Sequence, residues 1–170
     1  MNNSFSSLAI LIPAFNPNQN IIDLVLDLSY FKWNKVIVVN DGSSNESQIF
    51  FDNLNDFDNV HILTHQSNKG KGAAIKTGID YLNSKNTKLD GLITVDSDGQ
   101  HLVKDIEKIA REVKNRKNDV IFGVRLFDEN IPFRSKFGNK ITKHLLYIFN
   151  GISLADTQTG LRYLPVSIFD

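Results

Sequence analysis

The chain has 170 residues, and its 19 Lys+Arg balance 19 Asp+Glu, so the formal net charge is zero. This length is typical of one domain, and 41% apolar against 22% charged residues lies in the globular range. The balanced charge argues against a nucleic-acid-binding protein that works through a basic face. The sequence contains no cysteine, which excludes disulfides, thiolate metal sites and cysteine nucleophiles.

The first residues show no targeting signal. Residues 1–7 (MNNSFSS) are polar and lack the charged start and apolar centre of a signal peptide. The longest apolar runs, such as 8–14, are far shorter than the 18 or more residues that a membrane-spanning helix needs. We therefore expect a cytoplasmic protein.

Short apolar runs alternate with helical patterns for most of the chain. The runs predict strands at 8–12, 35–39, 60–63, 91–95 and 119–123. The first, which is ended by Pro13, suits a strand buried on both faces. Apolar residues at helical spacing predict helices at 20–30, from 70 onward and across 106–113. We also expect a polar helix at 45–56 and a further helix at 137–149. Such alternation indicates right-handed crossovers and a mainly parallel sheet flanked by helices. We predict one α/β domain over 1–170.

Polar segments follow the predicted strands. In a parallel sheet, ligands bind beyond the carboxyl ends of the strands. Five polar segments would meet at that edge, namely 13–16, 40–44, 64–72, 96–101 and 123–125. Their convergence is a stronger indication of a binding site than any one of them alone.

The segment Asp96–His101 (DSDGQH) carries two carboxylates two residues apart. In an extended chain, side chains at i and i+2 point the same way, so Asp96 and Asp98 could address one site. Together with the amide oxygen of Gln100 they form hard oxygen ligands suited to Mg²⁺ or Mn²⁺. The alternative interpretation is a surface turn after a strand, because Asp-x-Asp-Gly is a frequent turn sequence.

The segment Asn68–Gly72 (NKGKG) opens a predicted helix. The free N–H groups and positive dipole end of a helix start attract anions, and Lys69 and Lys71 add positive charge. The alternative is an ordinary helix start that contains glycines.

The segment Asn40–Ser44 (NDGSS) follows the second predicted strand. Asp41 can accept hydrogen bonds from a base or a ribose there, or the segment can simply turn the chain and cap a helix through its serines. We interpret His65 as a satisfied or exposed histidine, since it has no partner at ligand spacing.

Four segments in this order resemble the family 2 glycosyltransferases, which are inverting nucleotide-sugar enzymes of the GT-A fold. They are 12–16 (IPAFN), 39–44 (VNDGSS), 68–74 (NKGKGAA) and 96–101 (DSDGQH). Within that family the chain is similar to the polyprenyl- and dolichyl-phosphate sugar synthases through 123–125 (GVR), Arg134 and 156–162 (DTQTGLR). The similarity runs from about residue 8 to residue 164.

The resemblance implies a role for individual residues. The donor-binding residues would be Pro13, Ala14, Asn16, Asp41, Asn68, Gly70, Lys71, Asp96 and Arg134. The ligands of a Mg²⁺ or Mn²⁺ ion at the diphosphate would be Asp96, Asp98 and Gln100. The catalytic residues would be Asp98, Arg125, Asp156 and Arg162.

The chemistry of the residues is consistent with a phosphate acceptor. Guanidinium groups match phosphate oxygens, so Arg125, Arg134 and Arg162 could surround one, although surface salt bridging is the alternative. A phosphate acceptor is already anionic and needs no strong base. Asp156 is the remaining candidate base, and it could instead orient Arg162 or cap a turn.

The resemblance thus implies metal-dependent transfer of a hexose from a UDP- or GDP-sugar, with inversion, to a polyprenyl phosphate, at the cytoplasmic face of a membrane. Since relatives of this kind continue further, we expect the chain to be incomplete at its C-terminal end. One alternative is therefore a truncated, non-catalytic module that binds a nucleotide sugar. A haloacid-dehalogenase-type phosphatase is disfavoured, because its motif would lie on the first strand and would carry threonine at Gln100.

Overall fold

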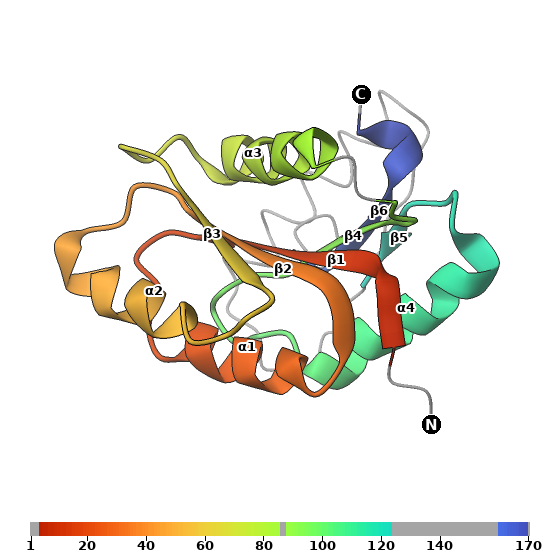
Figure 1. Ribbon diagram of the computed structural model, residues 1–170, viewed down its shortest axis with the longest axis horizontal. Coiled ribbons are helices and arrows are strands. Elements are labelled where there is room, and N and C mark those ends of the chain that lie inside the picture. The colour runs from red at the N-terminus through yellow and green to blue at the C-terminus, as the bar shows by residue number, and fades with distance from the viewer. Residues whose placement is uncertain (1–3, 86–87, 124–159, 170) are drawn as a thin grey trace, which may run out of the picture.

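The computed structural model describes residues 4–85, 88–123 and 160–169. These residues form a six-stranded sheet in the order β3-β2-β1-β4-β6-β5 (Figure 1). The strands are β1 (Ser4–Ala14), β2 (Lys32–Asn40), β3 (Val60–Thr64), β4 (Gly91–Thr94), β5 (Ile121–Phe122) and β6 (Arg162–Pro165). The helices are α1 (Asn20–Ser29), α2 (Gln48–Leu54), α3 (Lys71–Ser84) and α4 (Val103–Arg116), with short 3₁₀ turns η1 (Asn45–Ser47) and η2 (Val166–Ile168).

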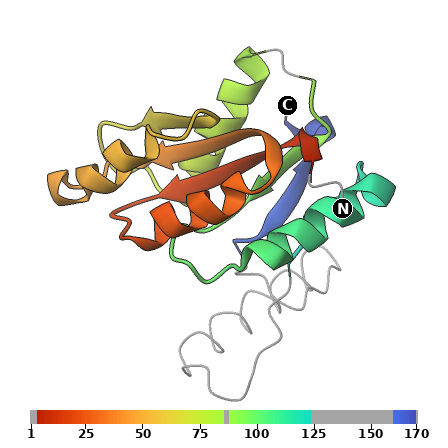
Figure 2. The same cartoon turned by 60° about the horizontal axis from the view of Figure 1, so that its bottom comes forward.

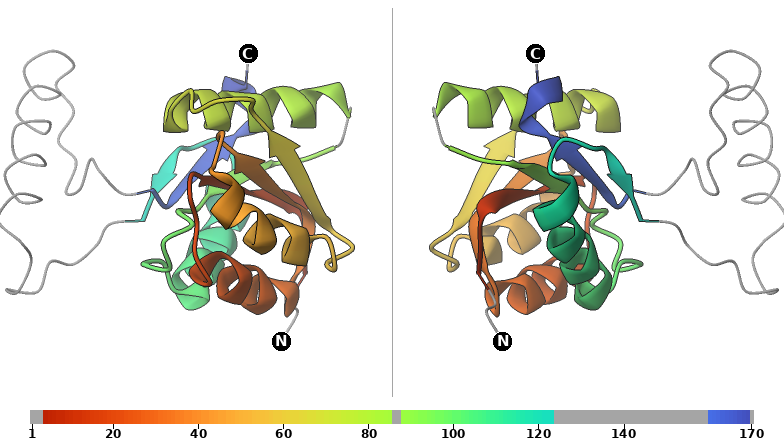
Figure 3. Two further views of the ribbon diagram at one scale, coloured as in Figure 1. Left: turned by 90° about the vertical axis from the view of Figure 1, so that its left-hand side faces the viewer. Right: turned by 90° about the vertical axis from the view of Figure 1, so that its right-hand side faces the viewer.

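Helices cover both faces of the sheet, which makes a three-layer domain. Helix α3 lies on one face, whereas α1, α2 and α4 lie on the other (Figures 1 and 3). Figure 2 shows α1 and α4 running along the same face. Strand β1 supplies both cores by strict alternation: Ile10 and Ile12 pack toward α1 and α4, and Ala9 and Leu11 pack toward α3.

The predicted parallel arrangement is confirmed for four strands. Strand β1 pairs in parallel with β2 and β4, and β2 pairs in parallel with β3. Strand β6, which the sequence pattern did not reveal, inserts antiparallel between β4 and β5. Its sequence, RYLP, has only two apolar residues between Arg162 and Pro165, so no apolar run stands out, and its partners lie far away along the chain.

The prediction that Pro13 ends the first strand is wrong. Strand β1 continues to Ala14, because Pro13 and Ala14 still pair with Val39 and Asn40 of β2. The carbonyl of Leu11 accepts the N–H of Val95 at 2.9 Å, so the backbone N–H and C=O groups of Leu11 point toward β4. Because this direction alternates along a strand, the backbone nitrogen of Pro13 also points to the β4 side. Pairing with β4 stops at Leu11, and the missing N–H of proline therefore costs no ladder bond.

The helices agree with the predicted pattern in their buried faces. The four apolar residues that predict the last described helix, Ile106, Ile109, Ala110 and Val113, are all buried in α4. The helix predicted at 45–56 is shorter and begins with the turn η1. The helix predicted at 137–149 lies outside the described residues. Among the described helices, none is long and apolar enough to cross a membrane.

Candidate functional site

The loops that follow β1 and β2 are joined by reciprocal hydrogen bonds. The backbone N–H of Asn16 donates to the Ser43 hydroxyl oxygen at 2.9 Å, and the N–H of Ser44 donates to Asn16 Oδ1 at 2.8 Å. Asn16 has a φ of 47°, a left-handed conformation that asparagine tolerates better than most residues. Within the second loop, the N–H of Ser43 donates to Asn40 Oδ1 at 2.9 Å. Asn16 therefore fixes the position of one loop against the other.

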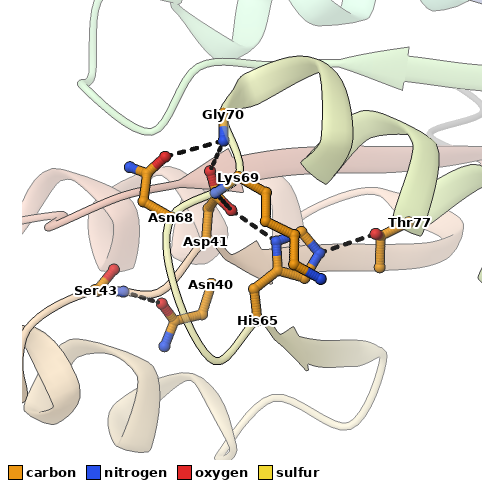
Figure 4. Close-up of polar contacts among 8 residues, drawn as sticks. All are labelled: Asn40, Asp41, Ser43, His65, Asn68, Lys69, Gly70 and Thr77. Atoms are coloured by element: carbon orange, nitrogen blue, oxygen red, sulfur yellow. Dashed lines mark hydrogen bonds and ion pairs between the residues drawn. The ribbon is translucent and has the colours of Figure 1, made fainter.

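Asp41 joins the loop after β2 to the loop after β3 (Figure 4). Its Oδ1 accepts the backbone N–H of Lys69 at 2.9 Å, and its Oδ2 accepts the N–H of Gly70 at 2.8 Å. The Nδ1 of His65 lies 2.6 Å from Oδ1. Both the Asp41 and the His65 side chains are buried, with 4% and 6% of their surface exposed.

The hydrogen bonds around Asp41 keep its carboxylate ionised. Burial acts to raise the pKa of Asp41, but the N–H of Lys69, the His65 imidazole and the N–H of Gly70 outweigh it and lower the pKa. Both carboxylate oxygens are thus engaged within the chain. Contact of Asp41 with a base or a ribose stays a prediction.

The same two loops also touch through their backbones. Gly42 has a φ of +70°, and a side-chain carbon added there would collide with the Ser67 and Asn68 backbone. Only glycine permits this approach. Asn68 is exposed, and its Oδ1 accepts the N–H of Gly70 at 2.9 Å within the same loop.

Asp96 joins the start of α3 to the loop after β4. One carboxylate oxygen pairs with the Lys71 ammonium, and the other lies 3.6 Å from Nε2 of the buried His101. Burial opposes ionisation of Asp96, but hydrogen bonds from His101 and Lys71 and their positive charges lower its pKa to about 2. Asp96 is therefore a carboxylate at neutral pH.

The extended conformation expected to align Asp96 with Asp98 is not present, and whether the two carboxylates address one site stays a prediction. The chain turns at residues 97–98 instead of continuing extended. The exposed Asp98 uses its Oδ1 to accept the N–H of Gln100 at 3.0 Å, and its carbonyl accepts Nδ2 of Asn20 at 2.6 Å. Within the described part of the chain, no three His, Asp or Glu side chains are grouped to hold a metal ion.

The oxygen atoms of the Asp96, Asp98 and Gln100 side chains nevertheless suit a hard divalent cation that takes its remaining ligands from a bound anion. Asp96 is ionised, and Asp98 is exposed. Both lie with Gln100 in the loop that follows β4. Metal ligation by these three residues stays a prediction.

Strand β6 brings a distant segment to this edge. Arg162 pairs with Thr94 at the end of β4, and its guanidinium lies 5.7 Å from the centre of the Phe122 ring. The Thr94 hydroxyl donates to the Gly160 carbonyl at 2.7 Å. Gly160 packs against the Asp96 carboxylate so closely that a side-chain carbon there would overlap it.

Most of the sequence-predicted site residues are thus gathered at the carboxyl edge of the sheet. Those linked by hydrogen bonds, ion pairs or strand pairing across this edge are Ala14, Asn16, Asp41, Asn68, Gly70, Lys71, Asp96, Asp98, Gln100 and Arg162. Pro13 lies beside them in β1. The predicted Arg125, Arg134 and Asp156 lie outside the described residues.

Sequence reasoning missed three polar residues at this edge. They are Asn20, which holds the turn of Asp98, and the two buried histidines His65 and His101. Each lies within seven residues of the end of a strand, and that position was the available signal. Their partners lie between 5 and 78 positions away, so local spacing could not identify most of the pairs.

The family is decided by comparison of the whole chain. Residues 9–169 match the model of "Glycosyl transferase family 2". The chain belongs to this family. The resemblance that the four loop segments indicated is therefore confirmed.

Named relatives act on lipid phosphates. The chain is 28% identical to the UDP-N-acetylglucosamine–dolichyl-phosphate N-acetylglucosaminyltransferase of Methanococcus voltae, over 90% of this chain and 67% of the relative. It is 28% identical to the dolichyl-phosphate beta-glucosyltransferase of Homo sapiens, over 91% of this chain and 53% of the relative. The chain thus spans about half to two thirds of the length of these curated relatives.

The fold matches a solved structure over nearly its whole length. Glucosyl-3-phosphoglycerate synthase from Mycobacterium tuberculosis, in complex with Mn²⁺, UDP-glucose and phosphoglyceric acid, superposes with a TM-score of 0.66. The match covers 95% of this chain and 57% of the other, at 16% identity. The family 2 glycosyltransferase domain therefore has the predicted GT-A fold.

Proposed function

We propose that this family 2 domain binds a UDP- or GDP-hexose and transfers the hexose, with inversion, to a polyprenyl or dolichyl phosphate. The observation that carries the proposal is that hydrogen bonds and an ion pair join the loops after four strands, through Asn16, Asp41 and the Lys71–Asp96 pair. The two relatives named as dolichyl-phosphate transferases support the acceptor class.

The donor would lie across these loops. The joined loops 13–16 and 40–44 form one end, where we place the nucleobase. The start of α3 supplies backbone N–H groups and the Lys71 ammonium, which suit the negative charge of a diphosphate. Lys71 already pairs with Asp96, so this end holds opposite charges side by side.

A Mg²⁺ or Mn²⁺ ion is part of the proposal. Asp96, Asp98 and Gln100 would hold it beside the diphosphate, as oxygen ligands. When bound, the ion would offset the negative charge that gathers on the nucleoside diphosphate as it leaves. The structural neighbour solved with Mn²⁺ and UDP-glucose supports this assignment.

The acceptor phosphate would approach from the β6 side. Arg162 lies at the carboxyl edge, next to the segment that packs on Asp96. We propose that Arg162, with Arg125 and Arg134, binds the acceptor phosphate, and that Asp156 acts as a base or orients Arg162. With such an acceptor the reaction would take place at a membrane surface, and we propose that this is the cytoplasmic face.

The donor half is tested by calorimetry. UDP-glucose, UDP-N-acetylglucosamine and GDP-mannose would be titrated into the chain with and without Mn²⁺. We expect saturable binding of at least one donor that weakens in Asp98→Asn but not in Asp80→Asn, a control carboxylate exposed on α3. Binding of none of the three donors would contradict the proposal.

The acceptor half needs a transfer assay with radiolabelled donor and a polyprenyl phosphate. We expect Arg162→Ala to reduce transfer while donor binding stays near the unmodified value. Donor binding without any transfer would favour the non-catalytic module instead.

A further inference from the structure

His65 lies directly after β3 and joins three elements. Its backbone N–H continues the sheet by donating to the carbonyl of Asn40 at 2.9 Å. Its ring lies between the end of β2 and helix α3, with Nδ1 at 2.6 Å from Asp41 Oδ1 and Nε2 at 2.9 Å from the Thr77 hydroxyl (Figure 4). Both ring nitrogens are therefore used.

The chemistry of the partners fixes the direction of these bonds. An ionised carboxylate can only accept, so Nδ1 of His65 carries a proton and donates to Asp41. In the neutral ring, Nε2 then accepts the hydroxyl proton of Thr77. Thr77 lies well inside α3, in a part of the helix that packs on the sheet. The imidazole thus ties the Asp41 carboxylate to the body of this helix.

Asp41 in turn holds the residues that begin α3. Its carboxylate accepts the N–H groups of Lys69 and Gly70, and the Gly70 carbonyl accepts the first helical bond, from Ala74 at 3.1 Å. The next residue, Lys71, reaches Asp96. A continuous line of contacts therefore runs from Thr77 through His65 and Asp41 to the start of the helix.

We propose that His65, anchored by Thr77, is a positioning residue that orients the Asp41 carboxylate and thereby fixes the Lys69–Lys71 segment for donor binding. The structural half of this inference stands on the contacts alone. The functional half rests on the proposed function. His65 lies behind Asp41 and is buried, so it acts on the donor only through the loop.

The structural half is tested without any donor, by amide hydrogen exchange of the ¹⁵N-labelled chain. Removal of a buried hydrogen bond to a charged group should speed exchange of the Lys69 and Gly70 amides about ten-fold or more in His65→Ala. His65→Asn keeps an N–H group near the position of Nδ1 and should restore much of the protection. Lys76→Ala, an exposed neighbour of Thr77 on α3, is the control and should change neither amide.

A second pair of variants decides the case if His65→Ala fails to fold. Thr77→Val removes the hydroxyl and should speed exchange of the same two amides, whereas Thr77→Ser keeps the hydroxyl and should not. Equal behaviour of Thr77→Val and Thr77→Ser would overturn the inference. So would exchange that rises evenly over α1 and α4, because that pattern reports global destabilisation.

The functional half is read from kinetics with the donor that binds. We expect the donor KM of Thr77→Val to rise between about three- and ten-fold and that of His65→Asn to rise less, with kcat and the acceptor KM changed less than about two-fold in both. A fall in kcat at unchanged donor KM would overturn the positioning role. If the unmodified chain binds no nucleotide sugar, the proposed function fails, and the exchange result still decides the role of His65 in the loop.

Discussion

A glycine series measures how closely the loops after β2 and β3 pack. Gly42 has a φ of +70° and lies against the Ser67 and Asn68 backbone, with an added Cβ only 2.6 Å from Ser67 Cα. A left-handed conformation alone costs alanine about 1 kcal/mol. The collision meets backbone atoms, which cannot rotate away, so the loop must shift. We expect Gly42→Ala to lower the free energy of unfolding by about 3 kcal/mol or more.

Two further glycines, one just before α3 and one inside it, separate the cost of the backbone conformation from the cost of the collision. Gly70 has a φ of +88° and a ψ of 156°, a backbone region that is essentially restricted to glycine, and no atom within 4 Å of an added Cβ. Gly70→Ala should therefore cost about 1–3 kcal/mol, from the backbone conformation alone. Gly72 lies in α3 with equally open space, and Gly72→Ala should be neutral or stabilise by up to about 1 kcal/mol. Collision predicts the order Gly42, Gly70, Gly72 from most to least destabilised.

The assay is urea unfolding followed by tryptophan fluorescence. Trp33 is the one tryptophan of the chain, and it is buried with its ring 4.8 Å from that of Phe5. Each variant would be compared with the unmodified chain at pH 7, and a shift of the urea midpoint at an unchanged m-value would be converted to free energy. If Gly42→Ala cost no more than Gly70→Ala, the packing argument for these loops would be refuted.

Three further predictions concern individual side chains. The pKa of Asp96 is lowered from 3.8 to about 2, so the unmodified chain should be more stable than Asp96→Asn by about 2 kcal/mol above pH 4. This difference in the free energy of unfolding should disappear toward pH 2 in urea titrations without metal, and a difference that stays constant would contradict the reasoning. The Tyr163 hydroxyl lies 2.7 Å from the carbonyl oxygen of Lys117 and 2.9 Å from that of Asp90, which share its single proton, so Tyr163→Phe should cost about 1–2 kcal/mol at pH 7. Burial and Asp90 raise the pKa of Tyr163 to about 12, so this difference should shrink as the pH rises above 10, and a difference that grows would contradict it. Lys76→Ala removes an exposed ion pair with Asp80 and should change thermal stability by less than about 0.5 kcal/mol, whereas a larger loss would show an unrecognised contact.

The sequence was sufficient to predict the features that depend on local periodicity. Apolar runs identified the four parallel strands, and helical spacing identified the buried face of α4. Because parallel strands end at one edge, the meeting of their loops also followed. The resemblance to the glycosyltransferase family was inferred from these same loops, and the family model matches residues 9–169.

The features that sequence alone could not supply depend on contacts between distant residues. Asp41 and His65 are 24 positions apart, and neither residue type indicates that both will be buried against each other. The turn at 97–98 depends on Asn20, which reaches it from 78 positions away. Strand β6 is recognised only from its pairing with β4.

The central claim is that a nucleotide sugar binds at the carboxyl edge of the sheet. The most direct measurement is a titration of the ¹⁵N-labelled chain with UDP-glucose and then GDP-mannose in the presence of Mg²⁺, followed by amide chemical shifts. The account predicts saturable shifts that are largest at Gly42, Lys69, Gly70 and Gly99. Shifts that do not saturate with either donor, or that centre on α2 and the far end of α4, would contradict it.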